Sequence, residues 1–91
     1  STITAVEQIG SGTWLVALAN GDLQRFTYSN AGSLSIGTTP VLNTMTYDEV
    51  NGWMYGGADG QVIIINTSTG SMTSSVAVNG SVRYVLPLYN R

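Results

Sequence analysis

The sequence predicts an all-β fold made of two repeated units of four short antiparallel strands, followed by one additional strand. The first observation is a repeat, because GTWLVALANGDL (12–23) and NGWMYGGADGQV (51–62) align without a gap. The two aligned segments begin at positions 12 and 51, and we call the spacing between these positions the repeat length. The second is the β-branched run VIII (62–65), which is typical of a strand covered on both faces. The third is composition, because Gly, Ser, Thr and Asn interrupt the chain too often for a long helix.

The chain is expected to form a single unit, 1–91, and its expected parts follow from the repeat. These parts are repeat one at 3–40, repeat two at 42–80 and an extra strand at 81–91. The expected strands, in chain order, are 3–9, 13–19, 22–28, 33–39, 42–48, 53–58, 61–66 and 71–78. Asn20-Gly21 and Asp59-Gly60 stand between the second and third strands of the two units, and such dipeptides favour tight hairpin turns. Asn51-Gly52 joins the first two strands of repeat two, and Asn79-Gly80 follows its fourth.

The segment 81–91 has the character of the first strand of a third unit, with Tyr84 near the register of Tyr47. An extra strand can join molecules by adding to an exposed sheet edge. It competes with the N-terminal strand 3–9 for an equivalent edge, so one of the two must be displaced, shared or left at an open end. We expect the extra strand to be ordered and to act as a clasp, so that truncation after Gly80 weakens the assembly.

The central part of repeat two, GADGQVIIINTSTG (57–70), resembles the middle of a β-propeller blade of the superfamily that includes the quinoprotein-like, YVTN and WD40-like repeats. The shared features are a strand, an Asp-Gly hairpin, an apolar strand and a Thr-Gly turn. Neither unit ends its third strand in the Trp-Asp pair of WD40 repeats, and the Trp docking pattern of the quinoproteins is absent. The resemblance covers both units and implies two four-stranded antiparallel blades, but it implies no ligand.

The composition excludes several kinds of site. The chain of 91 residues contains no Cys and no His, so a disulfide framework and a Cys/His zinc site are impossible. Only three residues are basic, all of them Arg, and the net charge is −2, which argues against nucleic acid as a partner. No segment is long and apolar enough to predict membrane insertion. Few charges and abundant Ser, Thr, Gly and Asn favour an extracellular or particle-surface location.

The number of repeats predicts self-association. Propellers close with about four to eight blades, so two blades leave an apolar face exposed at each end. Either the chain is a piece of a longer propeller, or several copies complete a ring. We expect a homo-oligomer, with a trimer favoured and a tetramer next, because cyclic symmetry then gives an even number of blades.

Four residues are candidates for ligand binding: Trp14, Trp53, Tyr55 and Arg25. Trp14 and Trp53 align in the repeat and could stack on sugars, although packing between blades is the more frequent role of such aromatic residues. A tyrosine such as Tyr55 tends to place its hydroxyl at a rim. Arg25 stands where repeat two has an apolar residue, so it lines a central tunnel or forms a salt bridge on an outer strand.

Two functional hypotheses remain open from sequence. The first is a non-enzymatic binding module, lectin-like, in which repeated weak carbohydrate sites gain avidity in one ring. The second is a structural or scaffold propeller fragment, natural, engineered or virion-associated, with no small ligand. No enzyme is expected, because the common nucleophile and base arrangements need His or Cys. No cofactor or metal is expected either, because the acidic residues lack the spacing of a calcium loop.

Overall fold

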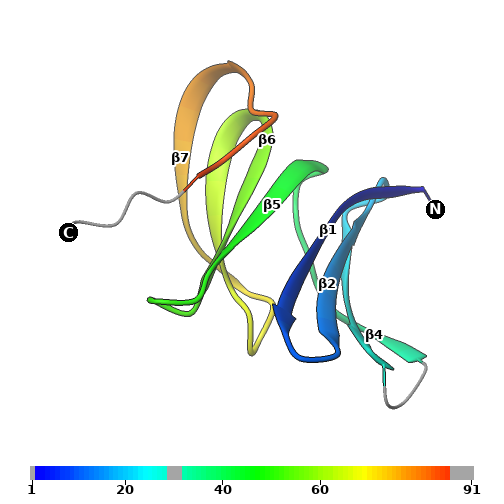
Figure 1. Ribbon diagram of the computed structural model, residues 1–91. Coiled ribbons are helices and arrows are strands. Elements are labelled where there is room, and N and C mark those ends of the chain that lie inside the picture. Colours follow the sequence, from blue (N-terminus) through cyan, green and yellow to red (C-terminus); the bar gives the residue numbers. More distant parts are fainter. Residues whose placement is uncertain (1, 29–31, 87–91) are drawn as a thin grey trace.

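The protein is built entirely of β-strands in two antiparallel sheets, as the computed structural model shows for residues 2–28 and 32–86 (Figure 1). The first sheet contains, in spatial order, β1 (Ile3–Gly10), β2 (Thr13–Leu18), β3 (Asp22–Thr27) and β4 (Gly32–Thr38). The second sheet contains β5 (Leu42–Asp48), β6 (Trp53–Asn66) and β7 (Met72–Ser81). Neither sheet closes on itself. The predicted all-β class is therefore confirmed.

The expected strands 53–58 and 61–66 form the single element β6, which folds back on itself near Gly60. Gly60 has a φ of +80°, which suits a tight turn. A Cβ on Gly56 would lie 3.1 Å from Cγ1 of Ile63, a contact that a straight strand could not make between positions so far apart in sequence. The first half of β6 pairs with β5 and the second half with β7. The arrangement within the second sheet is thus the one expected of a four-stranded unit.

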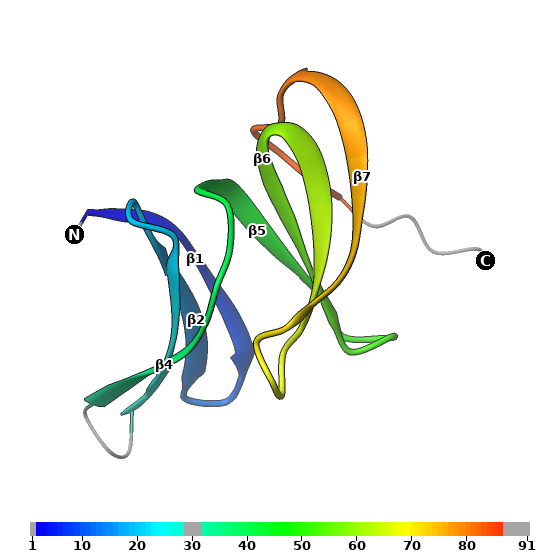
Figure 2. The same ribbon diagram turned by 180° about the vertical axis from the view of Figure 1, so that it is seen from behind.

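The two sheets are neighbours, and one face of each is turned toward the other (Figures 1 and 2). β1 contacts β5, and β4 and β7 are the last strands of their sheets. A backbone contact closes the other end of the junction, where Gly37 of β4 meets the turn that contains Gly70. The carboxylate of Glu7 on β1 accepts a hydrogen bond of 2.8 Å from the backbone N–H of Tyr47 on β5. The main core lies between the sheets.

The pairing registers of the two sheets repeat along the chain. Ile3 faces Leu18 and, one repeat length later, Leu42 faces Ala58, and each pair is followed by the same irregularity. Likewise Leu23 faces Gly37, and its counterpart Val62 faces Val76, the counterpart of Gly37. The first and third strands therefore correspond at the spacing of the sequence repeat. The fourth strands do so at Gly37 and Val76 but not throughout, because the irregularity of pairing falls at Leu23/Gln24 in the first sheet and at Ile64/Ile65 in the second.

The second strands do not keep that spacing. The expectation from the gapless alignment, that Trp14 and Trp53 are equivalent, is therefore wrong. Glu7 faces Leu15, whereas its counterpart Thr46 faces Tyr55, so the second strands correspond at one position more than the repeat length. The connection between the first and second strands spans 11–12 in the first sheet and 49–52 in the second. A slip of one residue moves a side chain to the other face of a strand. Trp14 therefore corresponds to Met54, and the two tryptophans lie on opposite faces of their units.

Each sheet has an inner face turned toward the other sheet and an open face turned away from it. The inner face of the first sheet carries Ala5, Glu7, Leu15, Ala17, Leu23 and Arg25. The inner face of the second sheet carries Met45, Tyr47, Met54, Gly56, Ala58, Ile63 and Ile65. Leu15, Met54 and Ile63 are completely buried, so the junction between the sheets is a packed core.

Candidate functional site

The open face of the first sheet is largely apolar and is not covered by any described residue of the chain. Its members are Val6, Gln8, Trp14, Val16, Leu18, Gln24 and Phe26. Val6 is 50% exposed, and the rings of Trp14 and Phe26 lie 5.9 Å apart between centroids. An apolar patch that contains two aromatic rings is typical of a surface that associates with another molecule.

This open face corresponds, strand by strand, to the inner face of the second sheet. Val6, Trp14 and Phe26 occupy the positions that Met45, Met54 and Ile65 hold one unit later. In the second sheet these positions are buried against the first sheet. The same positions are therefore covered in one unit and uncovered in the other.

A polar cluster borders this face along β3 and β4. The carboxylate of Asp22 accepts hydrogen bonds from Ser35 Oγ at 2.5 Å and from Gln24 Nε2 at 2.9 Å, and Ser33 donates to Gln24. The hydrogen bonds from Ser35 and Gln24 hold the pKa of Asp22 below its ordinary value of 3.8. The outer rim of the face is thus hydrophilic, as is typical of the margin of an interface.

The open face of the second sheet is more polar and is partly covered by the segment 82–86, which we call the tail. Its members are Thr44, Thr46, Tyr55, Gly57, Val62 and Ile64. Val82 of the tail packs over Gly57, where an added Cβ would lie within 3.0 Å of both Val82 and Thr44. This face corresponds to the inner face of the first sheet.

Asp48 is a buried carboxylate at the end of β5, with 1% exposure. It accepts hydrogen bonds from the backbone N–H groups of Val50 and Asn51, from the Asn51 side chain at 2.8 Å and from the Tyr55 hydroxyl at 3.3 Å. Burial, together with the neighbouring Asp48 carboxylate, raises the pKa of Tyr55. Asp48 therefore organises the turn between β5 and β6, a role that its place at the end of an expected strand did not indicate.

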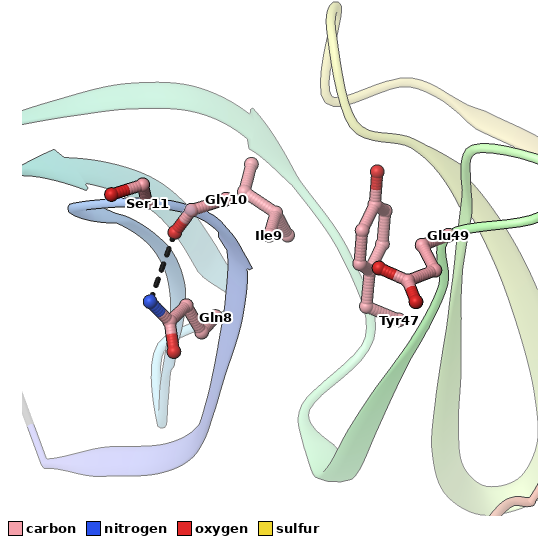
Figure 3. Close-up of a pocket in the computed structure, with 6 residues that line it drawn as sticks. All are labelled: Gln8, Ile9, Gly10, Ser11, Tyr47 and Glu49. Carbon is pink, nitrogen blue, oxygen red and sulfur yellow. Dashed lines mark hydrogen bonds between the residues drawn. The ribbon is translucent and has the colours of Figure 1, made fainter.

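A depression of about 330 Å³ lies between the turn after β1 and the end of β5 (Figure 3). It is lined by Gln8, Ile9, Gly10, Ser11, Tyr47 and Glu49. The ring of Tyr47 forms one wall, and the Gln8 amide donates a hydrogen bond of 3.0 Å to the carbonyl of Gly10 on the opposite side. An aromatic wall with carboxylate, amide and hydroxyl groups around it can accept a small polar ligand.

None of the four ligand-binding candidates from sequence lines this depression. Trp14 lies on the open face of the first sheet, and Trp53 and Tyr55 lie on the open face of the second. Arg25 is half-buried on β3, on the inner face, in the same cross-strand row as Leu15. The structure therefore does not gather these four residues into one site. The depression was missed because its walls come from the turn after β1 and from β5, far apart in sequence.

Comparisons with protein-family models, with curated proteins and with solved structures found no match to this chain. Within residues 2–28 and 32–86, no helix is long and apolar enough to cross a membrane. In the same residues, no group of three or more His, Cys, Asp or Glu side chains is placed to hold a metal ion.

Proposed function

We propose that the chain is a non-enzymatic, self-assembling β-propeller unit in which each sheet is one blade, and that copies associate head to tail into a closed ring. One observation supports this proposal. The open face of the first sheet corresponds to a face that the second sheet buries, and the open face of the second sheet corresponds to one that the first sheet buries. A second copy can therefore repeat, between chains, the contact that the two sheets make within one chain.

The contact between copies is heterologous, because two different faces of the same chain meet. Such contacts form a ring if their rotation closes, and a filament if it does not. Closure with about four to eight blades requires two to four copies, and we favour three, with four next. Trp14 of one copy and Trp53 of the next then lie at the same junction, which makes blade packing their role.

The fit between copies is not a full repeat of the internal junction. Gly37 lets β4 approach the Gly70 turn within the chain, since an added Cβ would lie 2.7 Å from the Gly70 carbonyl oxygen. The corresponding residue on the other open face is Val76, which is 58% exposed. The outer strands must therefore lie farther apart between copies than they do within one.

Three variants and one mixture test the head-to-tail contact. Val6→Asp places a charge on the open face of the first sheet, and Val76→Asp places one on the open face of the second. Each variant alone is expected to be a monomer by light scattering coupled to gel filtration, because an unpaired charge is costly in an apolar junction. Each still has one intact face, so an equimolar mixture is expected to form a heterodimer.

Val50→Asp is the matched control, because Val50 is 70% exposed in the turn after β5 and belongs to neither face. It should assemble like the unmodified chain. A monomeric unmodified chain at micromolar concentration would refute self-assembly. Oligomers of the Val76→Asp variant alone would instead indicate that two copies of the first sheet's open face meet each other.

The depression supports carbohydrate binding as a second candidate function. The Tyr47 ring offers an apolar surface for a sugar ring, and Gln8, Ser11 and Glu49 offer hydrogen-bonding groups. Several such sites in one ring would add avidity to weak binding. This role fits an extracellular or particle-surface location, which we also propose.

A glycan array with Tyr47→Ala tests this second candidate. Weak multivalent binding that Tyr47→Ala abolishes would support it. The control is Tyr84→Ala, since Tyr84 is 72% exposed and lies away from the depression. Binding that survives Tyr47→Ala would exclude the depression as the sugar site, whereas no binding by an assembled ring would leave the scaffold role alone.

A further inference from the structure

The tail crosses the open face of the second sheet and is held by few contacts (Figures 1 and 2). The N–H of Val82 donates to the carbonyl of Ala58 at 3.1 Å, and the Asn43 side chain donates to the carbonyl of Val82 at 3.1 Å. The Thr46 hydroxyl donates to the carbonyl of Val85 at 2.6 Å. The tail forms no strand ladder, and Tyr84 and Leu86 are 72% and 60% exposed.

The tail lies against β5 in the way that β5 lies against β1. Glu7 on β1 contacts the peptide group that joins Thr46 to Tyr47. Its counterpart on β5 is Thr46, which contacts the peptide group that joins Val85 to Leu86. The two contacted peptide groups are also one repeat length apart. The tail therefore occupies the place of the first strand of a following unit.

In a head-to-tail assembly, that same place belongs to β1 of the next copy. Glu7 precedes Thr46 by one repeat length, and Thr46 precedes Val85 by the same spacing. These three positions are therefore equivalent in successive units, and Glu7 of a second copy would lie where Val85 lies. Both segments cannot occupy one position against β5 at the same time. Assembly therefore requires that either the tail or the incoming β1 gives way.

We infer that the tail is a place-holder on the assembly face and that β1 of a second copy displaces it; this inference rests on the proposed head-to-tail assembly. β1 is the better anchored of the two segments. It pairs with β2 from Ile3 to Gly10 and supplies Ala5 and Ile9 to the core margin, whereas the tail has the three hydrogen bonds, the packing of Val82 and the attraction between Arg83 and the exposed Asp59 carboxylate. This assignment replaces the clasp that the sequence suggested, as far as the described residues 82–86 are concerned.

A docked tail lowers the apparent affinity between copies. Only the fraction of molecules with an undocked tail presents the complete face, so the apparent dissociation constant rises by the inverse of that fraction. The Thr46 hydroxyl donates to the carbonyl of Val85 while the tail is docked, and it would meet the corresponding carbonyl of β1 of the second copy once the tail is displaced. Thr46→Val is therefore expected to change the association equilibrium little.

Weakening the tail contact in the full chain tests the inference by sedimentation. Val82→Ser removes apolar packing over Gly57 and is expected to tighten association about fivefold, an effect of the size expected for a half-buried valine. Tyr84→Ser is the control, because its exposed side chain holds the tail only slightly, and it should associate like the unmodified chain. Weaker association of Val82→Ser would show that the tail strengthens the contact and would overturn the inference.

A reversible lock provides a second test. Thr44→Cys combined with Val82→Cys introduces the only two cysteines in the chain. The two replaced side chains are neighbours, because each lies within 3.0 Å of the position that a Cβ on Gly57 would take. The oxidised form, with its tail fixed, should remain monomeric at concentrations where the reduced form assembles. Equal assembly of both forms would overturn the place-holder while leaving self-assembly intact. A monomer in both forms and in the unmodified chain would refute the proposed function itself.

Discussion

The junction between the two sheets can be tested through the close backbone approach at Gly37 and Gly70. A Cβ on Gly70 would collide with the backbone of Ile36, lying 2.8 Å from its carbonyl carbon, and one on Gly37 would lie 2.7 Å from the Gly70 carbonyl oxygen. Gly70 also has a φ of +76°. Gly70→Ala therefore combines a strained backbone with a steric conflict, and Gly37→Ala introduces the conflict alone.

Two other glycines separate these effects. Gly60 has a φ of +80° but open space around its Cβ position, and Gly10 has neither a positive φ nor a neighbour within 4 Å. A left-handed backbone costs a non-glycine residue about 1–2 kcal/mol, and overpacking costs about 1–3 kcal/mol. We expect Gly10→Ala to be nearly neutral. Gly60→Ala should lose about 1–2 kcal/mol, Gly37→Ala about 1–3 kcal/mol and Gly70→Ala about 2–5 kcal/mol.

The measurement is urea unfolding followed by tryptophan fluorescence, in a Val6→Asp background that keeps the chain monomeric. In a domain of this size, each 1 kcal/mol corresponds to roughly 4–8 °C in Tm, which gives an independent check by calorimetry. If Gly70→Ala destabilised the chain no more than Gly60→Ala, the two sheets would not be in contact at this point. The described packing of β4 against the second sheet would then be wrong.

Three further predictions concern the core, the polar rim and the open face. Leu15→Ala should lower the free energy of unfolding by about 2–5 kcal/mol in chemical denaturation, because Leu15 is completely buried; a loss below about 1 kcal/mol would contradict a packed core. Because the folded-state pKa of Asp22 is lowered, its stabilising effect is present above its ordinary pKa of 3.8 and is lost as the pH falls through the lower folded value. Ser35→Ala should therefore flatten the acid dependence of Tm below about pH 4, whereas an unchanged slope would show that this hydrogen bond is absent. Trp14→Ala should weaken association about 30-fold or more, as expected for a central aromatic residue of an interface, and should leave the monomer folded by circular dichroism; an unfolded monomer would place Trp14 in the fold itself.

The sequence by itself determined the strand class, the repeat and the reversals at Gly21, Gly52 and Gly60, whereas Asn79-Gly80, expected to follow the last strand of repeat two, lies within β7. Alternating and β-branched segments between Gly-containing turns are local signals, and β1, β3 and β5 begin at the residues where such segments were expected. The reversal at Gly60 could also be predicted, because turn residues are readable without tertiary contacts. The extra strand expected at 81–91 is not seen as such: Ser81 belongs to β7, residues 82–86 form no strand, and 87–91 lie outside the described residues.

The tertiary structure decided which side chains share a face. The connection 49–52 between β5 and β6 is longer than its counterpart at 11–12, and this difference moves Trp53 out of equivalence with Trp14. Side chains alternate between the faces of a strand, so a slip of one residue changes every contact while leaving the aligned residues looking alike. The burial of Asp48 and the assembly of the depression likewise depend on turns that bring distant residues together.

The position of the tail also depends on tertiary structure. Sequence similarity placed the segment after Gly80 in register with a first strand, but its partner is set by which sheet surface is exposed beside it. Val82 fits over Gly57 because that position lacks a side chain and Thr44 borders it. A repeat thus fixes what each strand can pack against, whereas the folded chain determines which of the equivalent surfaces are already covered.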